Sequence, residues 1–195
     1  MNNHDLLHAI VNRDPRVKNM VSRYLSRRCG SHERAPAFCD LAESMDEQQF
    51  WTVFHNEWTG FDAIDHFIME QLIGNNAHAW RAEYMNEEDR AFYDSLPDTI
   101  TIYRGQGSQS YPGLSWTTDY TVAESFALGH RGHNRPDPIV IVATVSKSDI
   151  AGAYANREES EIVLFTPDYV EIVERKQLQQ RATKDASFLT TSRIY

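Results

Sequence analysis

The spacing of apolar residues changes near residue 97, and this change restricts the fold more than any other feature of the chain. Earlier in the chain, apolar side chains recur at helical spacing, as in Val17, Val21 and Leu25. The segment 99–103 instead alternates and is rich in β-branched residues, which is typical of a strand. Because the two patterns occupy separate parts of the chain, the sequence predicts an α+β protein with a helical N-terminal region, residues 1–96.

The helical region begins with residues 5–28, which we expect to be helical with a new start in the middle. There Pro15 follows Asp14, a pair typical of a first-turn proline behind an N-cap. Gly30 is expected to end this segment. Pro36 is assigned to the loop that follows.

Further helices are expected between residues 46 and 93. Asp46 is a predicted N-cap, and Asn86 is the predicted N-cap of a short helix that extends through Tyr93. Two apolar stripes at helical spacing lie between these caps: Phe50, Trp51, Phe54 and Trp58, then Phe61, Ile64, Ile68 and Leu72, ending at Gly74. Stripes of this kind are typical of a core, so we assign none of their members to a site.

Short β-prone runs predict further strands at 114–118, 139–145 and 169–173. The run 139–145 is almost wholly apolar, so its strand is expected to be buried on both faces. Asp119 is expected to cap a helix that precedes this buried strand. Residues 146–154 are interpreted as a turn.

Length and composition fit one folded domain. The chain has 195 residues, of which 41% are hydrophobic and 24% charged, as in ordinary soluble proteins. We divide it into the helical region, a strand-rich core at 97–175 and a polar tail at 176–195, all within one compact domain. No apolar run approaches the roughly 20 residues that span a bilayer, and no signal peptide is evident. We therefore expect a cytoplasmic protein without a membrane partner.

Cysteine content and charge bear on metals and partners. Cys29 and Cys39 suit a reducing compartment, and together with His32 they lack a fourth zinc ligand, so we predict no metal site. The net charge of −9 argues against non-specific binding to nucleic acid, in which a protein contacts phosphates whatever the nucleotide sequence. One dense basic cluster is either a solvated helix face or a docking surface for an acidic partner or RNA. It consists of Arg13, Arg16, Lys18, Arg23, Arg27 and Arg28.

An acidic turn leads directly into an apolar run at Ile162 to Phe165. If Glu159 and Glu161 belong to the same strand, their side chains point to one face and that of Ser160 to the other. Neighbouring carboxylates repel each other and are costly to desolvate without cationic or hydroxyl partners. The two glutamates can also simply flank the start of a strand, so a functional interpretation needs such partners elsewhere.

Suitable partners stand in two other predicted strands. Arg104-Gly105 follows the first strand, and Ser115-Trp116-Thr117 lies in the second. In their order and apolar context, these residues and Glu159-Ser160-Glu161 together resemble the mono-ADP-ribosyltransferases of the R-S-E clade. That clade includes bacterial toxins, phage enzymes and eukaryotic ectoenzymes. The resemblance covers about residues 99–173 and implies an ADP-ribosyltransferase-like split β-sandwich.

The resemblance implies NAD as the substrate. The NAD-binding residues it implies are Arg104, Gly105, Ser115, Thr117 and Phe126. A guanidinium fork suits two phosphate oxygens, so Arg104 would bind the pyrophosphate. Gly105 has no side chain, so its backbone could approach the nicotinamide amide closely. Ser115 would hydrogen-bond the catalytic glutamate or the ribose.

The catalytic set implied by the resemblance is Glu161, Glu159, Arg104 and Ser115. Breaking the bond between nicotinamide and ribose develops an oxocarbenium-like charge, which the carboxylate of Glu161 would stabilise. Glu159 would orient the acceptor and remove its proton. In the family, a glutamate at this position goes with arginine acceptors.

Two features depart from the family pattern. The loop from Arg104 to Ser115 is short, so part of the enclosure of NAD is expected from the loop between His130 and Arg135. Trp116 stands where the family often has a small residue. Because Trp116 points away from Ser115 on a strand, we expect it to lie in the core.

We therefore expect an NAD-dependent enzyme that transfers ADP-ribose to a macromolecular acceptor, either a protein side chain such as arginine or an RNA or DNA base. The clade alone suggests a toxin or phage-conflict effector, with an antitoxin or immunity protein as a neutralising partner. One alternative is an NAD glycohydrolase with water as acceptor, against which Glu159 argues. The other is a binding module with a decayed site, against which the intact Arg, Ser and Glu set argues.

Overall fold

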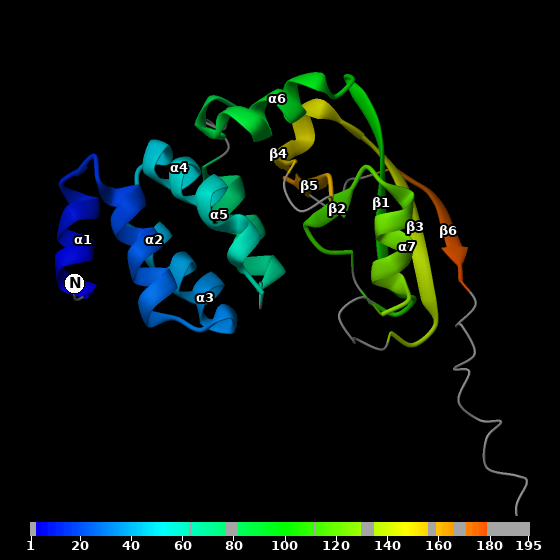
Figure 1. The fold of residues 1–195 in the computed structure, drawn as a ribbon, viewed down its shortest axis with the longest axis horizontal. Helices are drawn as coiled ribbons and strands as arrows, with labels where there is room; N and C mark the ends of the chain where they lie inside the picture. Colours follow the sequence, from blue (N-terminus) through cyan, green and yellow to red (C-terminus); the bar gives the residue numbers. More distant parts are fainter. Residues whose placement is uncertain are drawn as a thin grey trace, which may run out of the picture.

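The computed structural model describes residues 3–62, 64–76, 82–110, 112–129, 135–155, 159–165 and 171–178. Within these ranges nearly all helices precede an antiparallel sheet, so the predicted α+β class is confirmed. Figure 1 shows helices α1 to α5 beside the sheet, with α7 against β1 and β3.

The elements of the described chain have the following bounds. The helical segments are α1 Asn3–Val11, α2 Val17–Arg28, α3 Ser31–Ala42, α4 Glu47–Glu57, η1 Trp58–Gly60, α5 His66–Asn75, η3 Ala82–Tyr84, α6 Glu87–Ser95, α7 Tyr120–Ala127 and η5 Lys147–Asp149. The strands are β1 Thr99–Gly107, β2 Ser115–Thr117, β3 Pro138–Ser146, β4 Ile150–Tyr154, β5 Glu161–Leu164 and β6 Glu171–Gln177.

The described strands form one open antiparallel sheet in the order β4-β5-β2-β1-β3-β6. A row of register partners crosses four of them and consists of Tyr103, Thr117, Glu161 and Tyr154. β1 pairs with β3 along its whole length, whereas its register with β2 consists of the pair Tyr103 and Thr117. The half of the sheet formed by β4, β5 and β2 is therefore joined to the other half through a short contact.

Three predicted helix starts are confirmed, because each cap is a local signal. The side-chain oxygen of Asp46 accepts a hydrogen bond from the backbone N–H of Gln49 at 2.9 Å, and Gln49 completes a capping box. Asn86 caps α6 in the same way, at 2.9 Å from the nitrogen of Asp89. Asp119 caps α7 through the nitrogen of Thr121 at 2.7 Å. Each bond satisfies an N–H group that has no partner inside the helix.

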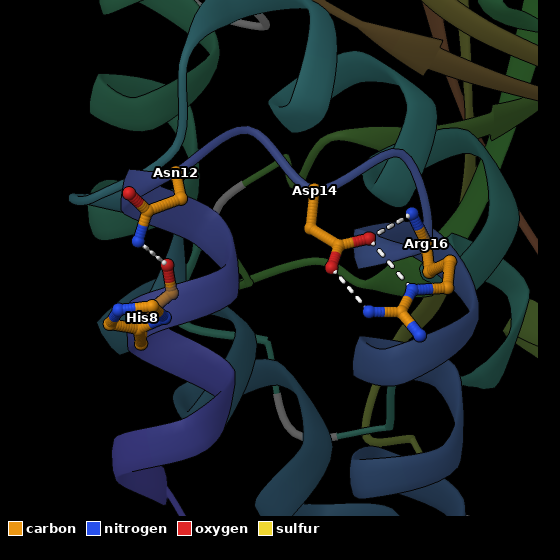
Figure 2. A network of polar contacts seen from close by, with 4 residues as sticks. All are labelled: His8, Asn12, Asp14 and Arg16. Carbon is orange, nitrogen blue, oxygen red and sulfur yellow. Dashed lines mark hydrogen bonds and ion pairs between the residues drawn. The ribbon is translucent and has the colours of Figure 1, made fainter.

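The break between α1 and α2 lies where it was predicted, but its cap is different. Asp14 does not cap α2; Arg16 precedes the first helical residue, Val17. The carboxylate of Asp14 instead accepts bonds from the backbone nitrogen, Nε and Nη2 of Arg16 at 2.8, 2.9 and 2.7 Å (Figure 2). These bonds lower the pKa of Asp14 from 3.8 to about 2. The same figure shows the side-chain amide of Asn12, which donates a hydrogen bond to the backbone carbonyl of His8 at the end of α1.

The loop predicted around Pro36 is wrong, because α3 passes through this residue. The helix starts where the backbone nitrogen of Gly30 donates to the carboxylate of Glu33 at 2.7 Å. Two of its apolar residues, Phe38 and Leu41, are buried at helical spacing. The proline removes one backbone donor, and the burial of this apolar face offsets that cost.

The apolar stripe predicted at Phe61, Ile64, Ile68 and Leu72 is only partly correct: Phe61 is buried, and Ile64 and Leu72 pack against the core. α5 begins at His66, where Asp65 caps it through the nitrogen of Ile68 at 3.1 Å. Its buried residues are Met69 and Ile73, whereas Ile68 is 45% exposed. The described residues between η1 and Asp65, namely 61, 62 and 64, are not helical, so helical spacing counted from Phe61 does not predict the buried face of α5.

The strand-rich half contains one strand that the sequence interpretation missed. β4 was assigned to a turn, yet all five of its residues are buried and it pairs with β5.

The predicted strand at 139–145 is confirmed as the middle of β3. Of the strand predicted at 169–173, residues 171–173 belong to β6, which continues to Gln177, and residues 169 and 170 lie outside the described ranges. The boundary drawn between core and tail at 175 and 176 therefore falls inside β6, and residues 179–195 lie outside the described ranges.

The core connects the helices to the sheet. One cluster joins α1 to α5 with Tyr154 and Val163 of the sheet. A second lies on the opposite face, where Ile102, Trp116 and Ile162 pack with residues of α6. In a third, α7 covers β1 and β3.

The basic cluster of the first helices is exposed to solvent. Arg13 Nε lies 3.1 Å from the carboxylate of Asp46, and Arg16 is paired with Asp14. Both findings are consistent with a solvated helix face. None of the helices in the described ranges is long and apolar enough to cross a membrane.

Candidate active site

A cavity of about 310 Å³ opens where the helical region meets the sheet. Its walls come from η1 and the segment after it, from β1, β2 and α7, and from the turn that leads into β5. All seven residues that the resemblance implied for the site line this cavity: Arg104, Gly105, Ser115, Thr117, Phe126, Glu159 and Glu161.

The register of β2 and β5 brings Ser115 and Glu161 together. Thr117 is the partner of Glu161, and Ser115 lies two residues earlier on the same face of β2. The hydroxyl of Ser115 donates a hydrogen bond to Oε1 of Glu161 at 2.6 Å. This bond couples the two residues that were expected to act together.

Arg104 lies inside β1, not at its end as predicted, and it marks the point where β1 and β2 diverge. Its Nη1 donates to the backbone carbonyl of Ser115, and its Nε donates to Oε1 of Gln106 at 3.0 Å. The guanidinium is therefore held in one orientation at the wall of the cavity. This orientation is set by groups of the protein before any ligand binds.

A second guanidinium, that of Arg135, lines the same cavity. Burial and, to a smaller extent, the charge of Arg135 lower the pKa of Arg104 to about 10, although the charge of Glu161 opposes the shift. Arg104 is still protonated at neutral pH. Among the described residues, the buried Nε of Arg135 has no hydrogen-bond partner. Two cations at one cavity suit a ligand with adjacent negative charges.

Glu159 reaches the cavity by a different route from the one predicted. β5 begins at Glu161, and Ser160 has a φ of 43°, so strand alternation does not extend back to Glu159. The backbone carbonyl of Glu159 accepts a bond from the hydroxyl of Thr117 at 2.6 Å, and this hydroxyl also accepts one from the nitrogen of Asp119 at 3.0 Å. The hydroxyl of Thr117 thus fixes the turn that presents Glu159.

Gly105 is explained first by packing. A Cβ atom at this position would overlap the carbonyl oxygen of Ala123 and stand 2.5 Å from the backbone nitrogen of Ala127. Both atoms belong to the backbone of α7, so the helix can lie this close to β1 only because residue 105 is a glycine. The same close packing brings Phe126 of α7 to the wall of the cavity.

Gly113 lies in a crowded position near Arg104. A Cβ there would stand 2.5 Å from Cε1 of His66 and 2.9 Å from Nη2 of Arg104. The nitrogen of Leu114 donates to Nδ1 of His66 at 3.4 Å. Burial and the charge of Arg104 lower the pKa of His66, which favours the neutral ring that accepts this bond.

The sequence interpretation missed the wall that comes from the helical region. Trp58, Phe61 and Ile64 were assigned to the core, and Trp58 and Phe61 are indeed buried, but all three also line the cavity. The indole N–H of Trp58 donates to Oε1 of Glu161 at 2.9 Å. Nothing in the aromatic stripe distinguishes Trp58 from its neighbours, so no sequence signal could have identified it.

Trp116 occupies the core as predicted. It is 2% exposed, packs on the face of the sheet opposite to Ser115, and donates to the carbonyl of Gly113 at 2.9 Å. Of the loop that was expected to help enclose NAD, Arg135 lines the cavity and residues 130–134 lie outside the described ranges.

The remaining candidate metal ligands and nucleophiles are described only for the part of the chain that the structure covers. No group of three or more His, Cys, Asp or Glu side chains that could hold an ion occurs there. Cys29 and Cys39 are free thiols, and burial raises the pKa of Cys39 to about 11. This thiol is thus protonated at neutral pH, which makes it a poor nucleophile.

No family model, curated protein or solved structure matches this chain. The interpretation of the cavity therefore depends on its own geometry: a carboxylate held by a hydroxyl and an indole, a fixed guanidinium, a second guanidinium whose Nε is buried, and a further carboxylate at the turn.

Proposed function

We propose that this protein is an NAD-dependent mono-ADP-ribosyltransferase whose active site is the cavity between the helical region and the sheet. The observation that carries the proposal is the contact chain from Arg104 through Ser115 to Glu161. Arg104 donates to the carbonyl of Ser115, whose hydroxyl donates to Glu161. These are the three residue types that define the R-S-E clade, and they meet on three neighbouring strands.

The short junction between β1 and β2 supports the finer fold assignment, a split β-sandwich of the ADP-ribosyltransferase type. β2 pairs with β5 at three positions, and its register with β1 is limited to Tyr103 and Thr117. The two halves of the sheet separate beyond this pair. A cleft at such a separation gives an extended dinucleotide access to side chains from both halves.

NAD binding would use the cationic part of the cavity. The pyrophosphate carries two negative charges, and the planar forks of Arg104 and Arg135 suit its oxygens. Arg104 keeps one orientation through its bonds to Ser115 and Gln106, so less conformational freedom is lost when the phosphate binds. Phe126 and Tyr103 add apolar wall for the rings of the ligand.

Cleavage would take place at Glu161. The bond between C1′ of the ribose and the nicotinamide nitrogen breaks, and its electron pair leaves with nicotinamide as a neutral ring. Positive charge then develops on the ribose, where the carboxylate of Glu161 stabilises it. A lone pair of the acceptor forms the new bond to C1′, and the carboxylate of Glu159 takes the proton that the acceptor loses.

The acceptor is a macromolecule in this proposal, with a protein side chain such as that of arginine favoured over an RNA or DNA base. Glu159 lines the cavity beside Glu161 and is presented by the turn at Ser160. A second carboxylate is needed for an acceptor that must lose a proton. Use as a toxin or phage-conflict effector in the cytoplasm, with a neutralising protein partner, extends the same proposal.

The test is to incubate the protein with NAD labelled in the ADP-ribose part and with a whole-cell lysate. Separate protease and nuclease treatment of the labelled product then identifies the acceptor class. Glu161→Gln should lower turnover by roughly two or more orders of magnitude and leave NAD affinity within several-fold, because the carboxylate acts mainly in the transition state. Wild-type turnover in this variant would refute the assignment, and release of nicotinamide without any labelled macromolecule would identify a glycohydrolase.

A further inference from the structure

Oε1 of Glu161 accepts two hydrogen bonds from opposite parts of the chain. The hydroxyl of Ser115 lies 2.6 Å away on the neighbouring strand, and Nε1 of Trp58 lies 2.9 Å away. Trp58 belongs to η1, the turn that follows α4 in the helical region. The second bond therefore links the carboxylate to a part of the protein outside the sheet.

The indole of Trp58 is held in one orientation by its surroundings. The side chain is 2% exposed, with ring centroids 5.1 Å from Phe54 and 6.3 Å from Phe61. The backbone carbonyl of Trp58 accepts a bond from the nitrogen of Phe61 at 3.0 Å, which closes the turn. Since the ring cannot rotate without disturbing this packing, the direction of its N–H group is fixed before NAD binds.

The two donors differ in what they can do. A serine hydroxyl rotates and both donates and accepts, so Ser115 is able to change partners when a ribose hydroxyl arrives. An indole N–H only donates, and here its direction is fixed. A donor of this kind keeps one carboxylate oxygen in place.

We propose that Trp58 is a positioning residue for Glu161 and that it makes the helical region part of the catalytic unit. The inference rests on the proposed function. Trp58 holds Oε1 while the ribose binds, so Glu161 keeps the orientation needed for bond cleavage even when Ser115 changes partners. On this basis α4 and η1 are required for catalysis itself and not only for stability or for contact with the acceptor.

The first experiment removes the donor and keeps an aromatic ring. Trp58→Phe should lower kcat for nicotinamide release by about ten-fold to a hundred-fold and leave the Kd for NAD within about three-fold. The matched control is Trp51→Phe in α4, which removes a bond of the same length, from Nε1 to the carbonyl of Asn76, at a residue that does not line the cavity. This control should keep the wild-type kcat, and thermal unfolding should confirm that both variants are folded.

The second experiment leaves Trp58 intact and requires no turnover. In a nitrogen-15 NMR spectrum, the indole N–H signal of Trp58 should move upfield in Glu161→Gln, because a neutral amide is a weaker acceptor than a carboxylate. The signal of Trp51 should stay where it is. A third experiment combines the two changes and does measure turnover. In the Glu161→Gln background, Trp58→Phe should lower residual turnover less than two-fold, because the group it positions has been removed.

The outcomes separate the two claims. If the wild type binds and cleaves no NAD, the proposed function fails, and the positioning role fails with it even if the indole signal responds to Glu161. If the wild type cleaves NAD and Trp58→Phe keeps the wild-type kcat, the positioning role alone is refuted. An unchanged indole signal of Trp58 in Glu161→Gln also refutes the positioning role. This second test applies even if Trp58→Phe does not fold.

Discussion

Gly105→Ala should both destabilise the protein and distort the cavity, because one displacement of α7 causes both effects. The added Cβ would overlap the carbonyl oxygen of Ala123 and stand 2.5 Å from the nitrogen of Ala127, both of which are backbone atoms of α7. An ordinary contact requires about 3.4 Å, so α7 would have to move away from β1 by roughly 1 Å or more. Overpacking of this kind costs about 1–3 kcal/mol and more when backbone atoms must shift. Because α7 carries Phe126 to the cavity wall, NAD affinity should fall as well.

The assay is urea unfolding followed by circular dichroism, with NAD affinity measured on the same preparations. Gly74→Ala is the matched control, because a Cβ at position 74 in α5 meets nothing within 4 Å. That change should stabilise the protein by about 0.5–1 kcal/mol, as expected for alanine in a helix. If Gly105→Ala matches wild-type stability but loses NAD binding, the glycine is needed for the ligand and not for the packing of α7.

Two further predictions concern a binding residue and a buried histidine. Arg104→Ala should weaken NAD binding by about 1.5–3 kcal/mol, and Arg104→Lys should recover little of this loss, because an ammonium cannot span two phosphate oxygens. Equal NAD affinities of Arg104→Ala and the wild type, measured by calorimetry, would contradict this role. Burial lowers the pKa of His55 from 6.5 to about 3, so between these pH values the unfolded state binds more protons. The stability that His55 contributes is complete above about pH 6.5 and is lost toward pH 3, by up to about 1.4 kcal/mol per pH unit. His55→Phe should flatten this slope in urea unfolding between pH 7 and pH 5, and an unchanged slope would show that His55 does not cause it.

The parts of the fold that the sequence predicts well depend on neighbouring residues. An N-cap needs one side chain and one N–H group two or three positions later, so Asp46, Asn86 and Asp119 could each be identified from their own surroundings. The switch from helical spacing to alternation is equally local. It predicted the α+β class and the strands β1 and β3.

The errors occur where packing over a distance overrides a local preference. Pro36 usually indicates a loop, but the buried face of α3 stabilises a helix around it. β4 reads Ile-Ala-Gly-Ala-Tyr, which is too short and too poor in β-branched residues to be recognised, and its pairing with β5 makes it a strand. In both cases the deciding partner lies elsewhere in the chain.

In the candidate site, too, some features depend on predicted local elements and others on packing between distant parts of the chain. Ser115 and Glu161 were expected together because the resemblance to the R-S-E clade implied it, and the register of β2 and β5 brings them to one face. The contact of Trp58 with Glu161 joins residues 103 positions apart, and it exists only because the helices share a core with the sheet. The positive φ of Ser160 is uncommon for a residue other than glycine, and simple strand alternation could not have predicted it.

The turn at Ser160 gives a direct test of the separate roles of Glu159 and Glu161. Glu161 belongs to β5 and is held by Ser115 and Trp58, whereas Glu159 lies before the strand, where its backbone carbonyl is fixed by Thr117. If Glu161 serves bond breaking and Glu159 serves the acceptor, Glu159→Ala should still split NAD slowly, with water as the acceptor. The same variant should not label its macromolecular target, because a guanidinium or an exocyclic amine must lose a proton to attack well.

The measurement is paired: nicotinamide release and label transfer are followed in one preparation of Glu159→Ala, with Glu161→Gln as the reference. The turn brings Glu159 to the cavity by a bend and not by strand alternation, so removal of its side chain leaves the hydrogen bonds to Oε1 of Glu161 in place. Nicotinamide release should therefore exceed that of Glu161→Gln. If both activities fall to the level of Glu161→Gln, the two carboxylates act as one unit. If both persist, Glu159 takes no part in the transfer, and the acceptor loses its proton to another group.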